Sequence, residues 1–369
     1  MQNIHILDDR LVSQIAAGEV VERPASVVKE LIENALDAGA TTVRIELEEG
    51  GKKRIRVVDD GSGMESEDAL LAFDRHSTSK ITTFDDLQNV ETLGFRGEAL
   101  SSIAAVARVE MQTAAAPGSG HKVRIEGGRV LFAEPVAHPR GTSLDVVSLF
   151  FNVPARREFL KSVRTELRRA TEVVQGYALT RPEVGFTLLH EGRLLLETTP
   201  GPAGPVGARE RIAEIFGPKL ANSLVEIEPT GVGEEFIWGF VGNTSTVRGR
   251  RYFTFVNRRL LRDRALMATF YRAVREEWRS EEFPALFLFL DLPGASIDVN
   301  VHPQKAEIRF RDQGSLERLS MALRRALGEA LGEAAAPLRQ PLSTPGVPFV
   351  WEGMGGTEPS GSELRERRF

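Results

Sequence analysis

The pattern of hydrophobic and polar residues predicts an amphipathic helix near the amino terminus. At about 100° per residue, Glu30, Asn34 and Asp37 fall on one side of this helix. The opposite side is apolar and carries Val28, Leu31, Ile32 and Ala35. Pro24 suits the first turn, and Gly39 suits the left-handed residue that ends a helix. Taken alone, the pattern predicts a helix with one core face and one acidic, solvated face.

Alternating apolar and charged residues predict a β-hairpin directly after this helix. Residues 43–47 and 55–58 alternate as strands do, and the glycines of residues 49–52 form the turn between them. The second strand runs into the sequence Asp-Asp-Gly-Ser-Gly-Met at residues 59–64. Residues 65–97 have no steady periodicity, which for a stretch of this length is typical of a functional lid.

The pattern farther along predicts a second domain. The proline- and glycine-rich residues 200–205 indicate a linker, so we expect domains at 1–200 and 208–331 and the start of a disordered linker at 332–369. The first domain should contain helices at 97–106 and 150–177, several strands within 107–147 and a hairpin at 184–198. The second should contain helices at 263–279 and 315–331 and strands near 224–228, 235–242, 252–256, 285–291, 297–301 and 306–310.

Composition narrows the class of protein. With 41% hydrophobic and 27% charged residues, the 369-residue chain has the balance of a soluble globular protein. No apolar run is long enough for a membrane span, and the amino terminus does not read as a signal peptide, so we expect no membrane association. The chain has no Cys, which excludes disulfides and thiol catalysis. The six histidines show no metal-binding spacing.

Three glycine-containing turns are candidate binding elements. In the first, Asp59 at a strand end could accept a hydrogen bond from an adenine amino group, and Gly61 and Gly63 could let a base approach the backbone. A plain hairpin-to-loop turn is the simpler interpretation of this segment alone. It is not a dinucleotide fingerprint, because Ser66 replaces the third glycine.

The second turn, Gly94–Leu100, opens a helix, where free amide groups attract phosphate. The third, Gly141-Thr142, enters a strand and is weak alone. No Gly-x-x-x-x-Gly-Lys-Ser/Thr string occurs, which excludes a P-loop enzyme.

Together these features resemble the GHKL ATPase family. Three longer strings, at residues 14–24, 94–100 and 298–305, are similar to the MutL branch of that family specifically. The likeness extends over residues 4–331 in the same order. It implies an α+β protein, with a GHKL (Bergerat) ATPase α/β sandwich followed by a ribosomal-protein-S5-domain-2-like α/β domain. Asp60 stands where many relatives have Asn, which leaves its contacts open.

The resemblance also implies roles for individual residues in a slow, DNA-stimulated ATPase that uses ATP and Mg²⁺. Glu30 would be the general base and Asn34 the magnesium ligand. Asp59 would recognise adenine, supported by Thr142, and Lys305 would stabilise charge on the γ-phosphate. The remaining nucleotide contacts would be Gly61, Gly63, Ser79, Lys80, Gly94, Phe95, Arg96, Gly97 and Glu98.

Charge distribution suggests a second ligand. Residues 1–100 sum to −9, whereas residues 101–330 sum to +5. The arginine-rich residues 248–264, and the helically spaced cations at 157, 161, 164 and 168, are ordinarily solvated faces, but they also suit sequence-independent contacts to DNA phosphates. We expect Lys161, Arg262 and Arg264 to contribute most to DNA binding.

The resemblance further implies a homodimer that forms on ATP binding and a mismatch-recognition partner of the MutS type. It also implies a cytoplasmic location in a bacterium, with the protein on the nucleoid when it is bound to DNA. Two alternatives remain open at this stage. One is an ATPase subunit similar to that of type II topoisomerases, and the other is a DNA-binding scaffold whose nucleotide site is vestigial.

Overall fold

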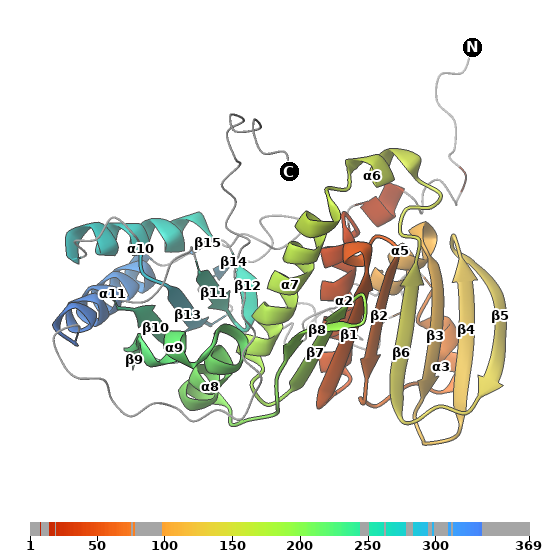
Figure 1. The fold of residues 1–369 in the computed structure, drawn as a ribbon, viewed down its shortest axis with the longest axis horizontal. Coiled ribbons are helices and arrows are strands. Elements are labelled where there is room, and N and C mark those ends of the chain that lie inside the picture. The colour runs from red at the N-terminus through yellow and green to blue at the C-terminus, as the bar shows by residue number, and fades with distance from the viewer. Residues whose placement is uncertain are drawn as a thin grey trace, which may run out of the picture.

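The computed structural model describes residues 8, 15–18, 20–74, 77, 98–243, 251–261, 263–277, 283–293, 297–298, 309–310 and 313–333. Two β-sheets lie side by side along the long axis of the molecule, and helices cover them (Figure 1). Mixed helix and strand of this kind confirms the α+β prediction.

The first sheet has eight strands in the order β5-β4-β3-β6-β2-β1-β7-β8. Their bounds are β1 (Thr42–Glu48), β2 (Arg54–Asp59), β3 (Arg108–Ala114), β4 (Gly120–Glu126), β5 (Arg129–Val136), β6 (Gly141–Val147), β7 (Gly185–His190) and β8 (Arg193–Glu197). Each neighbouring pair is antiparallel except β1 and β7, which are parallel. Both predicted hairpins, β1-β2 and β7-β8, are confirmed.

Helix α2 (Pro24–Asp37) packs on α7 (Val163–Thr180) and on β2. The four predicted core residues Val28, Leu31, Ile32 and Ala35 are buried, and the acidic Glu33 is buried with them. Pro24 begins the helix, and Gly39 has a φ of 71°, with its N–H donating to the carbonyl of Leu36 at 3.0 Å. Both predicted ends are therefore confirmed.

Three shorter helices and one 3-10 turn complete this part of the chain: η1 (Glu49–Gly51), α3 (Ser66–Leu71), α5 (Ala99–Val106) and α6 (Pro154–Phe159). The predicted helical region at 150–177 divides into two helices, because the chain leaves helical geometry between α6 and α7. Ser162 caps α7 by accepting a hydrogen bond from the N–H of Thr165, which starts a new helix.

The second sheet has five strands in the order β12-β11-β13-β10-β9. Their bounds are β9 (Leu224–Thr230), β10 (Phe236–Gly242), β11 (Tyr252–Val256), β12 (Arg259–Leu261) and β13 (Leu286–Asp291). The helices here are α8 (Gly204–Phe216), α9 (Pro218–Asn222), α10 (Arg264–Glu277) and α11 (Gln313–Glu333). A separate antiparallel pair, β14 (Ile297–Asp298) and β15 (Arg309–Phe310), covers the described parts of the last two predicted strands. The pattern did not predict β12.

The second sheet is buried on both faces. Leu286, Leu288 and Leu290 of β13 belong to the core beneath α10 and α11. Phe287 and Phe289 point to the opposite face and join the core shared with α8 and the first sheet. Phe287 and Phe289 therefore form part of the strand core. The predicted division into domains at 1–200 and 208–331 stays a prediction. Among the described residues, no helix is long and apolar enough to cross a membrane.

Candidate nucleotide site

The first part of the candidate site is the acidic side of α2. Glu30 and Asn34 lie one helical turn apart, about 6 Å along the axis. Glu30 is mostly covered, with 21% of its side chain exposed, and the ammonium of Lys29 lies 3.4 Å from its Oε1. A carboxylate and an amide are thus presented in the same direction, which is the arrangement that a water-activating base and a metal ligand require.

The second part is the turn that follows β2. The N–H of Gly61 donates to Asp59 Oδ1 at 2.9 Å, which folds the turn back over the end of the strand. The N–H of Ser62 donates to the carbonyl of Ala38 at 2.9 Å, just past the end of α2. The structure therefore ties the Asp59 turn to the helix that carries Glu30.

The carboxyl group of Asp59 has an unusual environment. Burial raises its pKa to about 6, against the hydrogen bonds from the N–H groups of Gly61 and Thr142, which lower it. At pH 7 and above the group is therefore mostly ionised and accepts hydrogen bonds. A partly buried acceptor of this kind suits the amino group of an adenine base.

The glycines of the turn serve the protein's own packing. Gly63 has a φ of 65°, and a Cβ there would lie 1.9 Å from the carbonyl oxygen of Ala114. A Cβ on Gly61 would lie 2.9 Å from the Cβ of Ala38. A Cβ on Gly141, with a φ of 118°, would lie 2.1 Å from the carbonyl oxygen of Asp59. These close contacts give a reason for each glycine that does not depend on an approaching base.

Thr142 is placed beside Asp59 by the pairing of β2 with β6. Its hydroxyl lies 3.0 Å from that of Thr113, which is fully buried on β3. The Thr113 hydroxyl also accepts from the N–H of Met64 at 3.0 Å and lies 3.2 Å from the carbonyl of Gly141. The sequence analysis missed Thr113, because only the β3-β6 register shows that it stands next to Thr142.

The side chain of Asp60 binds the residues before and at the start of β1 rather than the hydroxyls of Thr113 and Thr142. Its Oδ1 accepts from the N–H groups of Thr41 and Thr42 at 2.7 and 2.8 Å, and its Oδ2 accepts from the Thr41 hydroxyl at 2.5 Å. Although burial acts in the opposite direction, these hydrogen bonds lower the pKa of Asp60. The contacts left open by the sequence are therefore structural, and an Asn could make only some of them.

Glu98 is the residue before α5, and its carbonyl accepts from the N–H of Ser102 at 2.9 Å. The other predicted contacts lie outside the described residues: Ser79, Lys80, Gly94, Phe95, Arg96, Gly97, Arg262 and Lys305. Among the described residues, no group of three or more acidic or histidine side chains could hold a metal ion, so Asn34 would need phosphate and water as further ligands.

The predicted DNA contacts that the structure describes lie on separate elements. Lys161 is exposed between α6 and α7, and its backbone N–H donates to Glu166. Arg264 is exposed at the start of α10, where Asp263 accepts from two N–H groups and caps the helix. Arg157 and Lys161 do not share a helix face with Arg164, because the helix breaks between them. The prediction that the cations at 157, 161, 164 and 168 share one helix face is therefore wrong.

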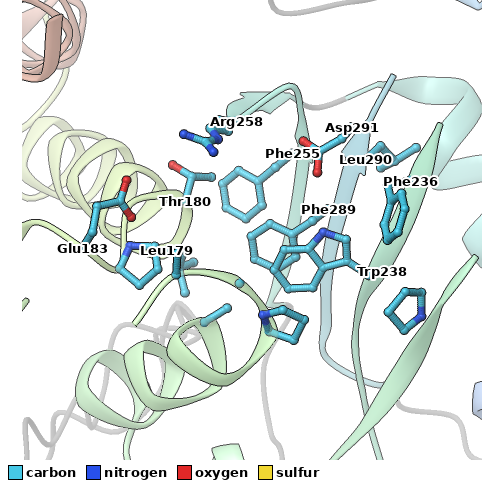
Figure 2. Close-up of a pocket in the computed structure, with 16 residues that line it drawn as sticks. Leu179, Thr180, Glu183, Phe236, Trp238, Phe255, Arg258, Phe289, Leu290 and Asp291 are labelled. Atoms are coloured by element: carbon cyan, nitrogen blue, oxygen red, sulfur yellow. The ribbon is translucent and has the colours of Figure 1, made fainter. Parts of the chain in front are cut away.

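One cavity of about 310 Å³ lies where α7 and α8 meet the second sheet (Figure 2). Its floor is aromatic, with Trp238 stacked on Phe289 at 4.1 Å between ring centres. Arg258, Glu183 and other polar groups stand at its rim. No predicted nucleotide contact lines it, so it is separate from the Asp59 site.

Two known protein families match separate parts of the chain. Residues 22–121 match the family described as histidine kinase-, DNA gyrase B- and HSP90-like ATPase. Residues 212–331 match the family described as DNA mismatch repair protein, C-terminal domain. The chain is 47% identical over 315 residues to the DNA mismatch repair protein MutL of Anaeromyxobacter dehalogenans strain 2CP-1, covering 85% of this chain and 51% of that protein. It is 44% identical to the MutL protein of Geobacillus thermodenitrificans, covering 87% of this chain and 50% of that protein. The chain thus spans about half the length of these relatives.

Solved structures are similar as well. The Aquifex aeolicus MutL ATPase domain complexed with ADP is 30% identical, with a TM-score of 0.54, covering 74% of this chain and 93% of that one. The N-terminal domain of a DNA repair protein is 26% identical, with a TM-score of 0.71, covering 88% of this chain and all of that one.

Proposed function

The chain belongs to the MutL family of DNA mismatch repair proteins, and from that premise we propose that it is a magnesium-dependent ATPase whose nucleotide state controls its partners in repair. The observation that supports this best is the connection between α2 and the Asp59 turn. It brings a candidate base, a candidate metal ligand and a candidate adenine acceptor into one region, each with the chemistry that its role requires.

In this proposal the α2 residues act on the phosphates. Glu30 accepts a proton from the attacking water. The low exposure of its side chain limits its contact with other water molecules. Asn34 holds the magnesium ion, which would supply positive charge to the phosphate oxygens. Lys305 and the predicted contacts between residues 79 and 98 complete the phosphate site.

Asp59 and Thr142 form the end of the proposed pocket that binds adenine. Asp59 accepts a hydrogen bond from the adenine amino group, and its ionisation near pH 6 keeps it an acceptor under neutral conditions. Thr113 fixes the Thr142 hydroxyl and so determines which atoms Thr142 presents to the base.

Two substitutions test the proposed ATPase. Glu30→Ala should abolish hydrolysis and keep nucleotide binding, whereas Asp59→Asn should lose binding. ATP turnover and the affinity for a fluorescent ATP analogue are measured separately on each purified variant. If neither substitution changes either quantity, the nucleotide site is vestigial and the proposal fails.

We also propose that ATP binding orders the predicted lid, closes the second domain through Lys305 and produces a homodimer that works with a MutS-type partner. Molecular mass in solution, measured by light scattering with and without a non-hydrolysable ATP analogue, tests this proposal. A shift from monomer to dimer supports it. An unchanged mass at saturating analogue contradicts it.

The last part of the proposal is sequence-independent DNA binding through Lys161, Arg262 and Arg264. Arg264→Glu should weaken binding equally for different sequences and reduce the slope of log affinity against log salt by about 1. Arg193→Glu, an exposed arginine on β8, is the matched control. Unchanged affinity of Arg264→Glu at low salt would refute the assignment.

A further inference from the structure

A buried acidic residue lies beside the proposed general base. Glu33 is on α2, three residues after Glu30, and only 3% of its surface is exposed. The hydroxyl of Tyr177, on α7, donates to Glu33 Oε1 at 2.5 Å. Tyr177 itself is buried in the core. Glu33 is therefore held in one position by a partner that is also fixed.

Lys29 connects this fixed carboxylate to Glu30. Its Nζ lies 3.6 Å from Glu33 Oε1 and 3.4 Å from Glu30 Oε1. An ammonium has three N–H donors, so one lysine can serve both carboxylates. Burial opposes the charge on Lys29, but the carboxylates of Glu33 and Glu30 outweigh it and raise the pKa of Lys29. Lys29 is therefore a stable cation at neutral pH.

The two carboxylates need this cation. Without it, Glu30 loses the ammonium that lies 3.4 Å from its Oε1. Glu33 cannot take that place, because burial raises its pKa and because Tyr177 and the core hold its side chain, so Glu30 would rotate toward solvent. The positive charge of Arg259, on β12, also acts on Lys29, Glu33 and Tyr177.

We propose that Lys29 is a positioning residue for the Glu30 carboxylate, and that Glu33 and Tyr177 are the anchor that holds Lys29 in place. This inference rests on the proposed role of Glu30 as general base. Lys29 itself touches neither water nor nucleotide in this account, because it acts only through the orientation of Glu30.

The test separates turnover from binding in Lys29→Met, which keeps the length of the side chain and removes its charge. A misplaced base costs about 10- to 100-fold in rate, so kcat should fall by that factor. The dissociation constant for a non-hydrolysable ATP analogue should stay within about twofold, since the residues assigned to nucleotide binding are unaltered. Lys29→Arg, which can still donate to both carboxylates, should recover most of the lost turnover.

A double variant distinguishes positioning from simple charge balance. Lys29→Met with Glu33→Gln removes the repulsion between the carboxylates but does not replace the missing donor to Glu30. Turnover should therefore remain low. Recovery of turnover in the double variant would show that Lys29 only neutralises Glu33, and would overturn the proposal. Lys219→Met, an exposed lysine on α9, is the control for loss of a lysine charge.

Two further results separate this inference from the proposed function. If Glu30→Ala loses hydrolysis but Lys29→Met keeps full turnover, the positioning role is wrong and the ATPase assignment stands. If Glu30→Ala keeps hydrolysis, the general-base assignment is wrong and Lys29 has nothing to position. A loss of turnover in Lys29→Met that comes with an equal loss of affinity also overturns the inference, because it indicates a damaged fold.

Discussion

Replacing Asp59 by Asn should make the protein more stable relative to the wild type as the pH rises. Burial raises the pKa of Asp59 from 3.8 to about 6, so the folded state holds the proton more tightly than the unfolded state does. These two values give a folding penalty for the ionised group of about 2 kcal/mol at pH 5 and about 3 kcal/mol at pH 8. Asn carries no charge and has no such penalty.

The sign follows from the direction of the shift. The contribution of Asp59 to stability is greatest below pH 3.8, where the group is protonated in both states, and it is lost as the pH rises through about 6. Relative to Asp59→Asn, the wild type should therefore lose about 1 kcal/mol between pH 5 and pH 8. Any constant effect of the amide on packing cancels, because only the change with pH is compared.

Urea unfolding of both proteins at pH 5, 6, 7 and 8, followed by circular dichroism, measures this difference. In parallel, the affinity for a fluorescent ATP analogue at pH 8 should be much lower in Asp59→Asn. When a binding residue is kept at a cost in stability, replacing it should raise stability and weaken binding. A stability difference that does not change between pH 5 and pH 8 would refute the reasoning about burial of the Asp59 carboxylate.

Four other substitutions test hydrogen bonds and close packing in the fold through urea unfolding. Asp60→Asn should cost about 1 kcal/mol at pH 7, and the cost should shrink as the pH falls below 3.8, because the pKa of Asp60 is lowered in the folded state. Gly63→Ala should cost about 3 kcal/mol, since its Cβ would meet the Ala114 carbonyl, whereas Gly118→Ala, with a positive φ in open space, should cost about 1 kcal/mol. Arg211→Met should cost about 3 to 5 kcal/mol, because this arginine is 1% exposed and donates to several backbone carbonyls. Equal costs for the two glycines, or less than about 1 kcal/mol for Arg211→Met, would contradict these assignments.

Local signals explain why much of the fold could be predicted. The core face of α2 and its ends at Pro24 and Gly39 depend on residues within one or two helical turns, so the sequence contains them directly. The β1-β2 hairpin depends on alternation and on the short turn at residues 49–52. In contrast, α6 and α7 are separated by only a few residues, and the apolar and basic spacing continues across the break, so periodicity alone predicted one helical region.

The supports of the site could not be predicted in the same way, because they depend on contacts between distant residues. Glu33 reads as one more acidic residue of a solvated face until Tyr177, 144 positions away, is placed opposite it. Thr113 reads as an ordinary strand residue until β3 pairs with β6. The motif residues themselves were recognisable because their chemistry is local to short strings.

The structure adds a physical link between the site and the second sheet. Helix α7 presents Tyr177 to Glu33 on one side, and on the other side it meets β12. A Cβ on Gly176 would lie 2.9 Å from Leu260 of β12, so the absence of a side chain there sets how closely the strand approaches the helix. The positive charge of Arg259, next to Leu260 on the same strand, also acts on Glu33 and Tyr177. The second sheet is thus connected to the proposed catalytic base through α7, Tyr177, Glu33 and Lys29, by contacts between side chains that are far apart in the sequence.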